Sequence, residues 1–185
     1  MIFQNPFPSI PPTVLRRMAL AQGIIVLLIV LGTGWAHAEH PVLISPFDHL
    51  KKLVGTWHGV QQSLEGEEQI TVSYSLTAKG SAVIERLFPG SSKEMISLYT
   101  QHGPDVIMTH YCMLGNQPRM RSHHNTTANR LTLTYIDGTG MRTADEMHMH
   151  ELTIIFVDDS QMTHEWTLYD KGRKKVTNTF TFKRK

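Results

Sequence analysis

Residues 70–77 read Ile-Thr-Val-Ser-Tyr-Ser-Leu-Thr, and every second side chain in this stretch is apolar. Ile70, Val72, Tyr74 and Leu76 therefore share one face of an extended chain, while serine and threonine side chains occupy the other face. This is the period of a β-strand with one buried and one solvated face. The stretch predicts such a strand and indicates an all-β fold.

Segments of the same period recur along the chain at intervals of about ten residues. They predict strands over residues 55–64, 70–77, 81–88, 94–102, 105–114, 119–125, 130–136, 146–157, 161–169 and 174–183. The sequence shows no crossover helix between these strands, so neighbouring strands are expected to pair as antiparallel hairpins.

Short connections with turn-forming residues separate many of these strands. They are Lys79-Gly80, Gly103-Pro104, Asp137-Gly138, Asp158-Asp159-Ser160 and Asp170-Lys171-Gly172. An open sheet of this length would leave two exposed edges, and closing the sheet removes both. The predicted fold is a single antiparallel meander β-barrel of about ten strands, with a β-sandwich as the alternative.

One short helix is predicted before the first strand. Ser45 is a suitable N-cap, Pro46 stands at the first helical position, and Asp48 is placed to complete a capping box. Phe47 and Leu50 lie three residues apart and share one helix face. This face is expected to cover one end of the barrel.

The first 38 residues have the features of an export signal. Arg16 and Arg17 precede an apolar run over residues 24–31, and Ala36-His37-Ala38 follows as a small-x-small triplet. Cleavage is expected after Ala38. The alternative is an uncleaved membrane anchor, since the apolar stretch can be extended to approach the roughly 20 residues that span a bilayer.

Cleavage would divide the chain into a signal over residues 1–38, a short linker over 39–44 and a barrel domain over 45–185. The protein is then expected to be periplasmic or secreted, without stable membrane association. Removing residues 1–38 takes away two positive charges and no acidic residue, so the formal net charge falls from +2 to 0. A nucleic-acid partner is not expected for such a domain. Cys112 is the only cysteine, so no intramolecular disulfide can form.

The segment Gly55-Thr56-Trp57 after the predicted helix resembles the glycine-x-tryptophan motif that begins the first barrel strand in the calycin superfamily. Residues 80–90, 109–112, 115–120 and 165–167 extend the likeness. Together they resemble a group of bacterial lipocalin-like β-barrel proteins of unknown function, over roughly residues 45–184. This resemblance implies the barrel fold and no particular activity.

More distantly, the chain resembles the nitrobindin-like haem-binding barrels, which also have a glycine-threonine-tryptophan start after a short helix. Those barrels use a histidine late in the chain as the haem ligand. His164 is the nearest candidate here, although the residues around it differ from that family's motif.

Strand alternation predicts which side chains line the barrel cavity. The inward face of three strands carries Val106, Met108, His110 and Cys112, then His148, His150, Leu152, Ile154 and Phe156, and finally Met162, His164, Trp166 and Leu168. His148 and His150 would project on the same side about 7 Å apart, a spacing that can support zinc or copper with a third ligand from His110 or His164. The alternative is that these histidines line a polar cavity and bond to water and to each other.

Glu85 lies in an apolar strand and needs a partner such as Arg86 or Arg119, because otherwise its pKa should rise. It is a candidate base, and the alternative is exposure at the barrel rim. Asn116 and Arg119 follow a strand, where polar groups at a barrel mouth can bind a carbonyl or carboxylate, or can serve a tight turn instead. Cys112 fits a small buried apolar residue better than a nucleophile.

The function predicted from the sequence is binding of a small, mostly apolar ligand in the barrel cavity. The predicted ligand-binding residues are Tyr74, Glu85, His110, Cys112, Asn116, Arg119, His150 and Trp166. The predicted metal-ligand candidates are His110, His148, His150 and His164. The first alternative is metal or haem binding through these histidines. The second is a cavity enzyme of isomerase or lyase type, with Glu85 or a histidine as acid and base.

Overall fold

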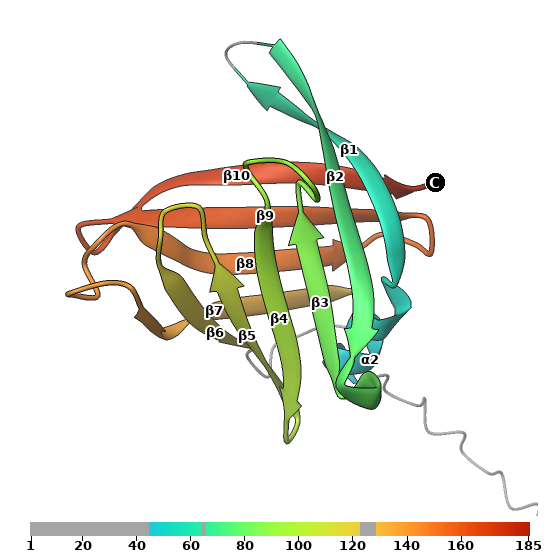
Figure 1. Cartoon of the computed structure of the whole chain (residues 1–185), viewed down its shortest axis with the longest axis horizontal. Coiled ribbons are helices and arrows are strands. Elements are labelled where there is room, and N and C mark those ends of the chain that lie inside the picture. The colour runs from blue at the N-terminus through green and yellow to red at the C-terminus, as the bar shows by residue number, and fades with distance from the viewer. Residues whose placement is uncertain (1–44, 64–65, 123–128) are drawn as a thin grey trace, which may run out of the picture. The chain divides into compact units, whose positions relative to one another are not determined.

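The computed structural model describes residues 45–63, 66–122 and 129–185. In this part of the chain ten strands form a closed antiparallel barrel in the order β1-β10-β9-β8-β7-β6-β5-β4-β3-β2, preceded by one short helix (Figure 1). The first strand pairs with both the second and the last, which closes the sheet. The predicted meander barrel is confirmed and the sandwich alternative is wrong. The predicted signal and linker lie outside the described residues.

The elements follow one another with short connections. Their bounds are α2 Pro46–Lys52, β1 Gly55–Ser63, β2 Gly66–Thr77, η1 Ala78–Gly80, β3 Ala82–Leu87, β4 Met95–His102, β5 Asp105–Tyr111, β6 Gln117–Ser122, β7 Arg130–Thr139, β8 His148–Phe156, β9 Gln161–Asp170 and β10 Arg173–Arg184. The far ends of β1 and β2 extend beyond the neighbouring strands, away from α2 (Figure 1). Among the described residues no helix is long and apolar enough to cross a bilayer.

Helix α2 is capped by Ser45 as predicted, but the Asp48 side chain bonds to the Ser45 hydroxyl, whereas in a capping box it would bond to the Ser45 backbone N–H. The Ser45 hydroxyl oxygen accepts a hydrogen bond from the Asp48 backbone N–H at 3.1 Å and donates one to the Asp48 carboxylate at 2.8 Å. Phe47 and Leu50 are buried and belong to the barrel core. The helix also contacts β4 and β5, so it covers an end of the barrel as predicted.

The last strand fastens the helix to the barrel. The Arg184 guanidinium lies 4.2 Å from the centre of the Trp57 ring and donates to the backbone carbonyls of Val54 and Lys52, each at 2.7 Å. The Trp57 indole N–H donates to the Leu53 carbonyl at 2.8 Å. The glycine-threonine-tryptophan segment therefore joins α2 to the first and last strands.

Several predicted strand ends differ from the structure. β2 begins at Gly66 and β6 at Gln117, instead of at residues 70 and 119, and two further ends differ for a local reason. β5 ends at Tyr111 instead of residue 114, because the Gly115 N–H bonds back to the Cys112 carbonyl and forms a turn. The turn predicted at Asp137-Gly138 lies inside β7, which extends to Thr139. A register shift between Arg119 and Met120 on the partner strand β6 accommodates this extension.

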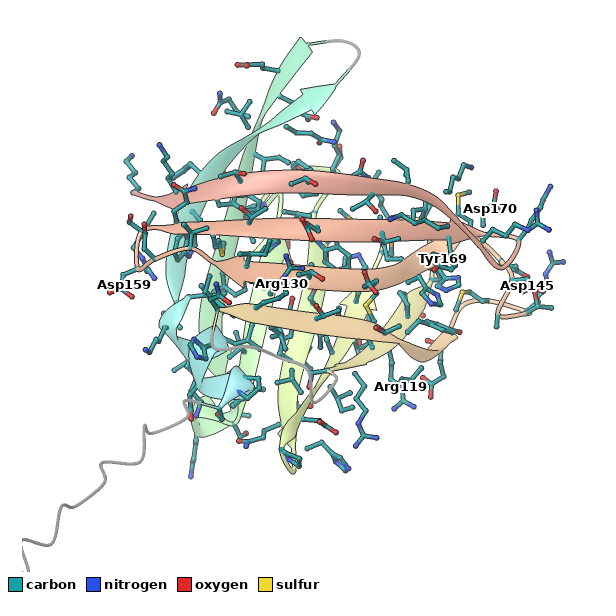
Figure 2. The ribbon with its side chains drawn as sticks, turned by 180° about the vertical axis from the view of Figure 1, so that it is seen from behind. Arg119, Arg130, Asp145, Asp159, Tyr169 and Asp170 are labelled. Atoms are coloured by element: carbon teal, nitrogen blue, oxygen red, sulfur yellow. The ribbon has the colours of Figure 1, made fainter. Side chains whose placement is uncertain are left out.

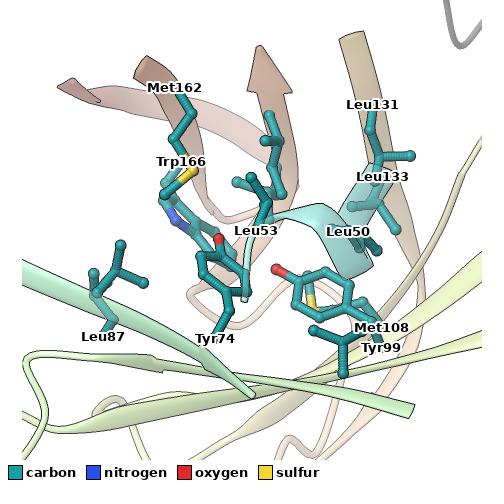
Figure 3. Packing of buried hydrophobic residues seen from close by; sticks show 14 of the residues in the cluster. Leu50, Leu53, Tyr74, Leu87, Tyr99, Met108, Leu131, Leu133, Met162 and Trp166 are labelled. Carbon is teal, nitrogen blue, oxygen red and sulfur yellow. The ribbon is translucent and has the colours of Figure 1, made fainter. Parts of the chain in front are cut away.

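A second irregularity changes which side chains of β8 face inward. The pairing of β8 with β9 shifts between Met149 and Glu151, so the strict alternation predicted from His148 to Phe156 is wrong. Leu152 and Ile154 are fully buried as predicted, but before the shift it is Met149 that packs against the core. Figure 3 shows part of the interior cluster of buried hydrophobic residues, among them Leu131 and Leu133 of β7 and Met162 and Trp166 of β9.

Candidate functional site

A row of polar side chains crosses four neighbouring strands inside the barrel. Tyr74 on β2 is the register partner of Glu85 on β3, Glu85 of Ser97 on β4, and Ser97 of His110 on β5. Directly paired residues on one face of a sheet have their Cβ atoms about 5 Å apart. All four side chains are buried. We call these four residues the polar row.

Glu85 is the acidic member of the polar row and is 1% exposed. Its Oε2 atom accepts hydrogen bonds from the Tyr74 hydroxyl at 2.9 Å and the Tyr99 hydroxyl at 2.5 Å. Its Oε1 atom is buried without a hydrogen-bond partner. Burial raises the pKa of Glu85 to about 7, against smaller lowering effects of Tyr99, Tyr74 and Ser97.

Neither arginine considered as a partner from the sequence reaches Glu85. The Arg86 guanidinium pairs with the Glu94 carboxylate at 2.7 Å, and Arg119 pairs with Asp137. The carboxyl group is therefore held by hydroxyl groups alone, and it titrates close to neutral pH.

His164 on β9 reaches the polar row from across the barrel. Its Nε2 atom lies 2.9 Å from the Tyr74 hydroxyl oxygen, and its ring meets Phe182 edge-on. Burial lowers the pKa of His164 to about 3, so the imidazole is neutral near pH 7. Tyr74 thus connects a neutral imidazole to the Glu85 carboxyl.

His110 is the last residue of the polar row, and it lines a pocket. Its Nδ1 atom lies 3.0 Å from the Ser97 hydroxyl oxygen, and its ring centre is 4.6 Å from that of Trp166. Burial lowers the pKa of His110 to about 4, so this imidazole is also neutral near pH 7. Because one edge of the ring is turned to Ser97, the opposite edge with Nε2 is the part left for a ligand.

The pocket has a volume of about 260 Å³ and lies beside the connection between β3 and β4, which contributes Phe88 and Lys93 to its lining. Its lining residues are mostly apolar and include Leu87, Phe88, Met95, His110, Met149, Trp166 and Phe180. Leu87 and Met95 are register partners one layer above Glu85 and Ser97, so the polar row lies beneath the pocket wall. The Trp166 indole N–H is buried and has no acceptor among the described residues.

His148 and His150 belong to a different group of side chains. The His148 Nε2 atom lies 3.1 Å from His150 Nδ1, and the His150 ring stacks on Tyr169 with centres 3.8 Å apart. Tyr135 completes this cluster, with its ring centre 4.3 Å from that of His148. Figure 2 shows Tyr169 near the same end of the strands as Asp145 and Asp170. Neither histidine lines the pocket of His110.

Three other predicted ligand-binding residues also lie away from this pocket. The buried Asn116 side chain donates to the Met147 carbonyl at 2.8 Å and fastens two connections together. Cys112 is buried beside the turn at Gly115. Arg119 forms a two-point ion pair with Asp137 on the outer surface, where Figure 2 shows its side chain. Tyr74, Glu85, His110 and Trp166 are thus the four predicted residues that the fold brings together.

The four candidate metal ligands do not form one set. His110 contacts Ser97, His164 contacts Tyr74, and His148 contacts His150. The described residues contain no group of three or more histidine, cysteine, aspartate or glutamate side chains that could hold a metal ion. Haem does not fit either, because His164 is fully buried, is engaged by Tyr74, and does not line the pocket.

Ser97 and Tyr99 are functional candidates that the sequence interpretation missed. Both lie on the strand predicted over residues 94–102, in the alternation set by Met95. Their inward face was therefore readable from the sequence, but their importance depends on the register with β3 and β5, which strand periodicity does not specify.

No family model and no curated protein matches this sequence. Among solved structures, a protein of unknown function from the DUF3598 family of Nostoc punctiforme PCC 73102 is similar, with 14% sequence identity and a TM-score of 0.49. The match covers 80% of this chain and 53% of that chain, so this chain spans about half the length of its structural neighbour. Such a match adds nothing about function.

Proposed function

We propose that the barrel binds a small, mostly apolar molecule in the pocket between Trp166, His110 and Phe180. The observation that carries this proposal is the buried Trp166 N–H, which has no acceptor among the described residues and belongs to a residue of the pocket wall. An unpaired buried donor costs roughly 1–3 kcal/mol, and a ligand oxygen or nitrogen would remove that cost.

The size and lining of the pocket limit the ligand. Its volume of about 260 Å³ is just under the roughly 300–1,000 Å³ typical of sites for drug-sized molecules. The ion pair between Lys93 and Glu68, at 2.7 Å, stands among the lining residues and supplies charge at the rim. A compact apolar body with one hydrogen-bonding group at its inner end fits this arrangement.

The calycin-like relationship and export are part of the same proposal. A barrel that encloses a pocket at one end is consistent with a calycin-type binding protein, and the N-terminal pattern is that of an exported chain. The protein would then carry or sequester its ligand outside the cytoplasm.

The test is to express the full-length chain, purify the protein without denaturation and identify co-purified molecules by native mass spectrometry. We expect a small apolar compound that contains an oxygen or nitrogen acceptor. Trp166→Phe should weaken its binding about three- to tenfold, because one hydrogen bond is lost.

Trp57→Phe is the matched control, since it also removes an indole N–H, but at the α2 end of the barrel. Equal loss of affinity in the two variants would contradict the assignment of the pocket. So would binding of small apolar molecules that Trp166→Phe leaves unchanged.

A further inference from the structure

The hydrogen of the Ser97 hydroxyl in the polar row can point in two directions. Ser97 stands between Glu85 and His110, as register partner of both. Its oxygen lies 3.0 Å from His110 Nδ1, and the Oε1 atom of Glu85, its partner on β3, is buried without a hydrogen-bond partner. A serine hydroxyl has one proton, so it can donate to only one of these neighbours at a time.

We propose that Glu85, Ser97 and His110 form a proton relay that sets whether the pocket offers its ligand a lone pair or an N–H at His110 Nε2. This inference rests on the proposed function, because it assigns the selectivity of the same pocket. His110 stays neutral in both states, and only its tautomer changes.

In the first state Glu85 is ionised. Its unpartnered Oε1 then accepts a hydrogen bond from the Ser97 hydroxyl, and the Ser97 oxygen accepts one from Nδ1–H of His110. Nε2 presents a lone pair to the pocket. A ligand hydroxyl can donate to Nε2 and accept from the Trp166 N–H, so this state favours alcohols and phenols.

In the second state Glu85 is protonated. Since Oε2 already accepts from Tyr74 and Tyr99, the added proton belongs on Oε1 and is donated to the Ser97 oxygen. Ser97 then donates to Nδ1, and Nε2–H points to the pocket. A carbonyl oxygen can accept from both Nε2–H and the Trp166 N–H, so this state favours ketones and similar acceptors.

Conversion from the second state to the first releases one proton. Nε2 gives a proton to water in the pocket, the Ser97 proton moves to Nδ1, and the Glu85 proton moves to Ser97, which leaves Glu85 ionised. This gives a carboxyl that is 1% exposed a route for exchange with solvent.

Other groups near Glu85 do not titrate in the same range. Burial raises the pKa values of Tyr74 and Tyr99 well above their ordinary value, and it lowers those of His110 and His164 well below theirs. Near pH 7, Glu85 is therefore the member of this set that changes charge.

The first test needs no ligand. Side-chain ¹H–¹⁵N NMR of the protein distinguishes the two neutral histidine tautomers, with His110 assigned by the signals missing from His110→Gln. Between about pH 5.5 and about pH 8.5, on either side of the Glu85 pKa of about 7, we expect His110 to change from the Nε2–H to the Nδ1–H tautomer. A single tautomer throughout, or a cationic ring, would overturn the relay.

Two variants separate the relay from a structural role. Glu85→Gln should hold the Nε2–H tautomer at every pH, because the Gln amide donates permanently to Ser97, and Ser97→Ala should abolish the pH dependence. His150→Gln is the control, since His150 lies outside the pocket and stacks on Tyr169. It should leave the change of tautomer at His110 intact.

The second test uses two probes of similar shape, para-tert-butylphenol as a hydroxyl donor and para-tert-butylacetophenone as an acceptor. Calorimetry should show the phenol binding about three- to tenfold tighter at the higher pH, and the ketone binding tighter by the same factor at the lower pH. If both probes bind with flat profiles, the relay does not select ligands, although the proposed function stands. If neither probe binds while His110 changes tautomer, the relay stands and the proposed function fails.

Discussion

The two sides of the barrel interior are equally buried but differ in chemistry. β7 and β8 contribute Leu131, Leu133, Leu152 and Ile154, each with no exposed surface. β2 to β5 contribute the polar row to the same interior. Burial of apolar groups stabilises a fold directly, whereas a buried carboxyl costs free energy unless its hydrogen bonds are complete. The apolar side, formed by β7 and β8, therefore explains why the barrel is stable. The polar side, formed by β2 to β5, calls for a functional explanation.

The largest effect on stability is expected when a buried side chain of the apolar side is shortened. Leu152→Ala should lower the free energy of unfolding by about 2–5 kcal/mol, because it removes buried contacts and leaves a cavity. Urea unfolding measures this loss. Leu76→Ala, at a position that is 47% exposed, is the control and should cost less than about 0.5 kcal/mol. Similar losses in both variants would contradict the division into a stabilising side and a functional side.

The next effect concerns the pH dependence of the polar side. Burial raises the pKa of Glu85 from 4.5 to about 7. Between these values the folded protein keeps a proton that the unfolded chain has released, so this group makes the protein less stable as the pH rises. Glu85→Gln lacks this linkage. As the pH rises from about 4.5 to about 7, the free energy of unfolding of Glu85→Gln should increase relative to that of the parent protein by up to about 3 kcal/mol. Above about pH 7 this difference should stay constant.

Urea unfolding of both proteins at several pH values measures this difference. His110 and His164 have lowered pKa values and affect stability in the opposite direction. They make the folded protein less stable as the pH falls toward their pKa values of about 4 and about 3. Because both proteins contain these histidines, their contribution cancels in the difference. A difference that stays constant with pH would show that folding leaves the pKa of Glu85 unchanged.

A smaller effect is expected from Tyr99→Phe. The Tyr99 hydroxyl donates to Glu85 at 2.5 Å, and a hydrogen bond to a charged group contributes about 1.5–3 kcal/mol. That loss should be seen above pH 7 and should shrink at lower pH, where the carboxyl is neutral. Tyr111→Phe, at a residue that is 52% exposed, is the control and should leave the free energy of unfolding nearly unchanged at either pH. A loss independent of pH would indicate a packing role only.

The contrast between the two sides also explains what could be predicted from the sequence. Strand periodicity predicted the barrel and the inward positions of Tyr74, His110 and Trp166, since a period of two is a local property. The helix was predicted separately, from the capping residue Ser45 and from Pro46 at the first helical position. Strand periodicity failed at His148 and His150, because the shift between Met149 and Glu151 in β8 reverses the alternation.

The polar row itself depends on register, which is not a local property. Glu85 was recognised from the sequence as a carboxyl that needs a partner or a raised pKa, and the raised pKa is what the structure shows. Its neighbours could not be named, because Ser97 and His110 come together only when β3, β4 and β5 pair in this register. The pocket depends on register in the same way.

The smallest effect is expected on the outer surface. Arg119 and Asp137 form an ion pair with both side chains about half exposed to water, 50% and 51%. Solvent screens such a pair, so Arg119→Ala should leave the urea midpoint unchanged within error. It should also leave the affinities for the phenol and the ketone unchanged, because Arg119 lies outside the pocket of His110 and Trp166. A loss of affinity for either probe would instead place the ligand at the outer depression near Arg119 and Asp137, and would make the polar row a structural feature.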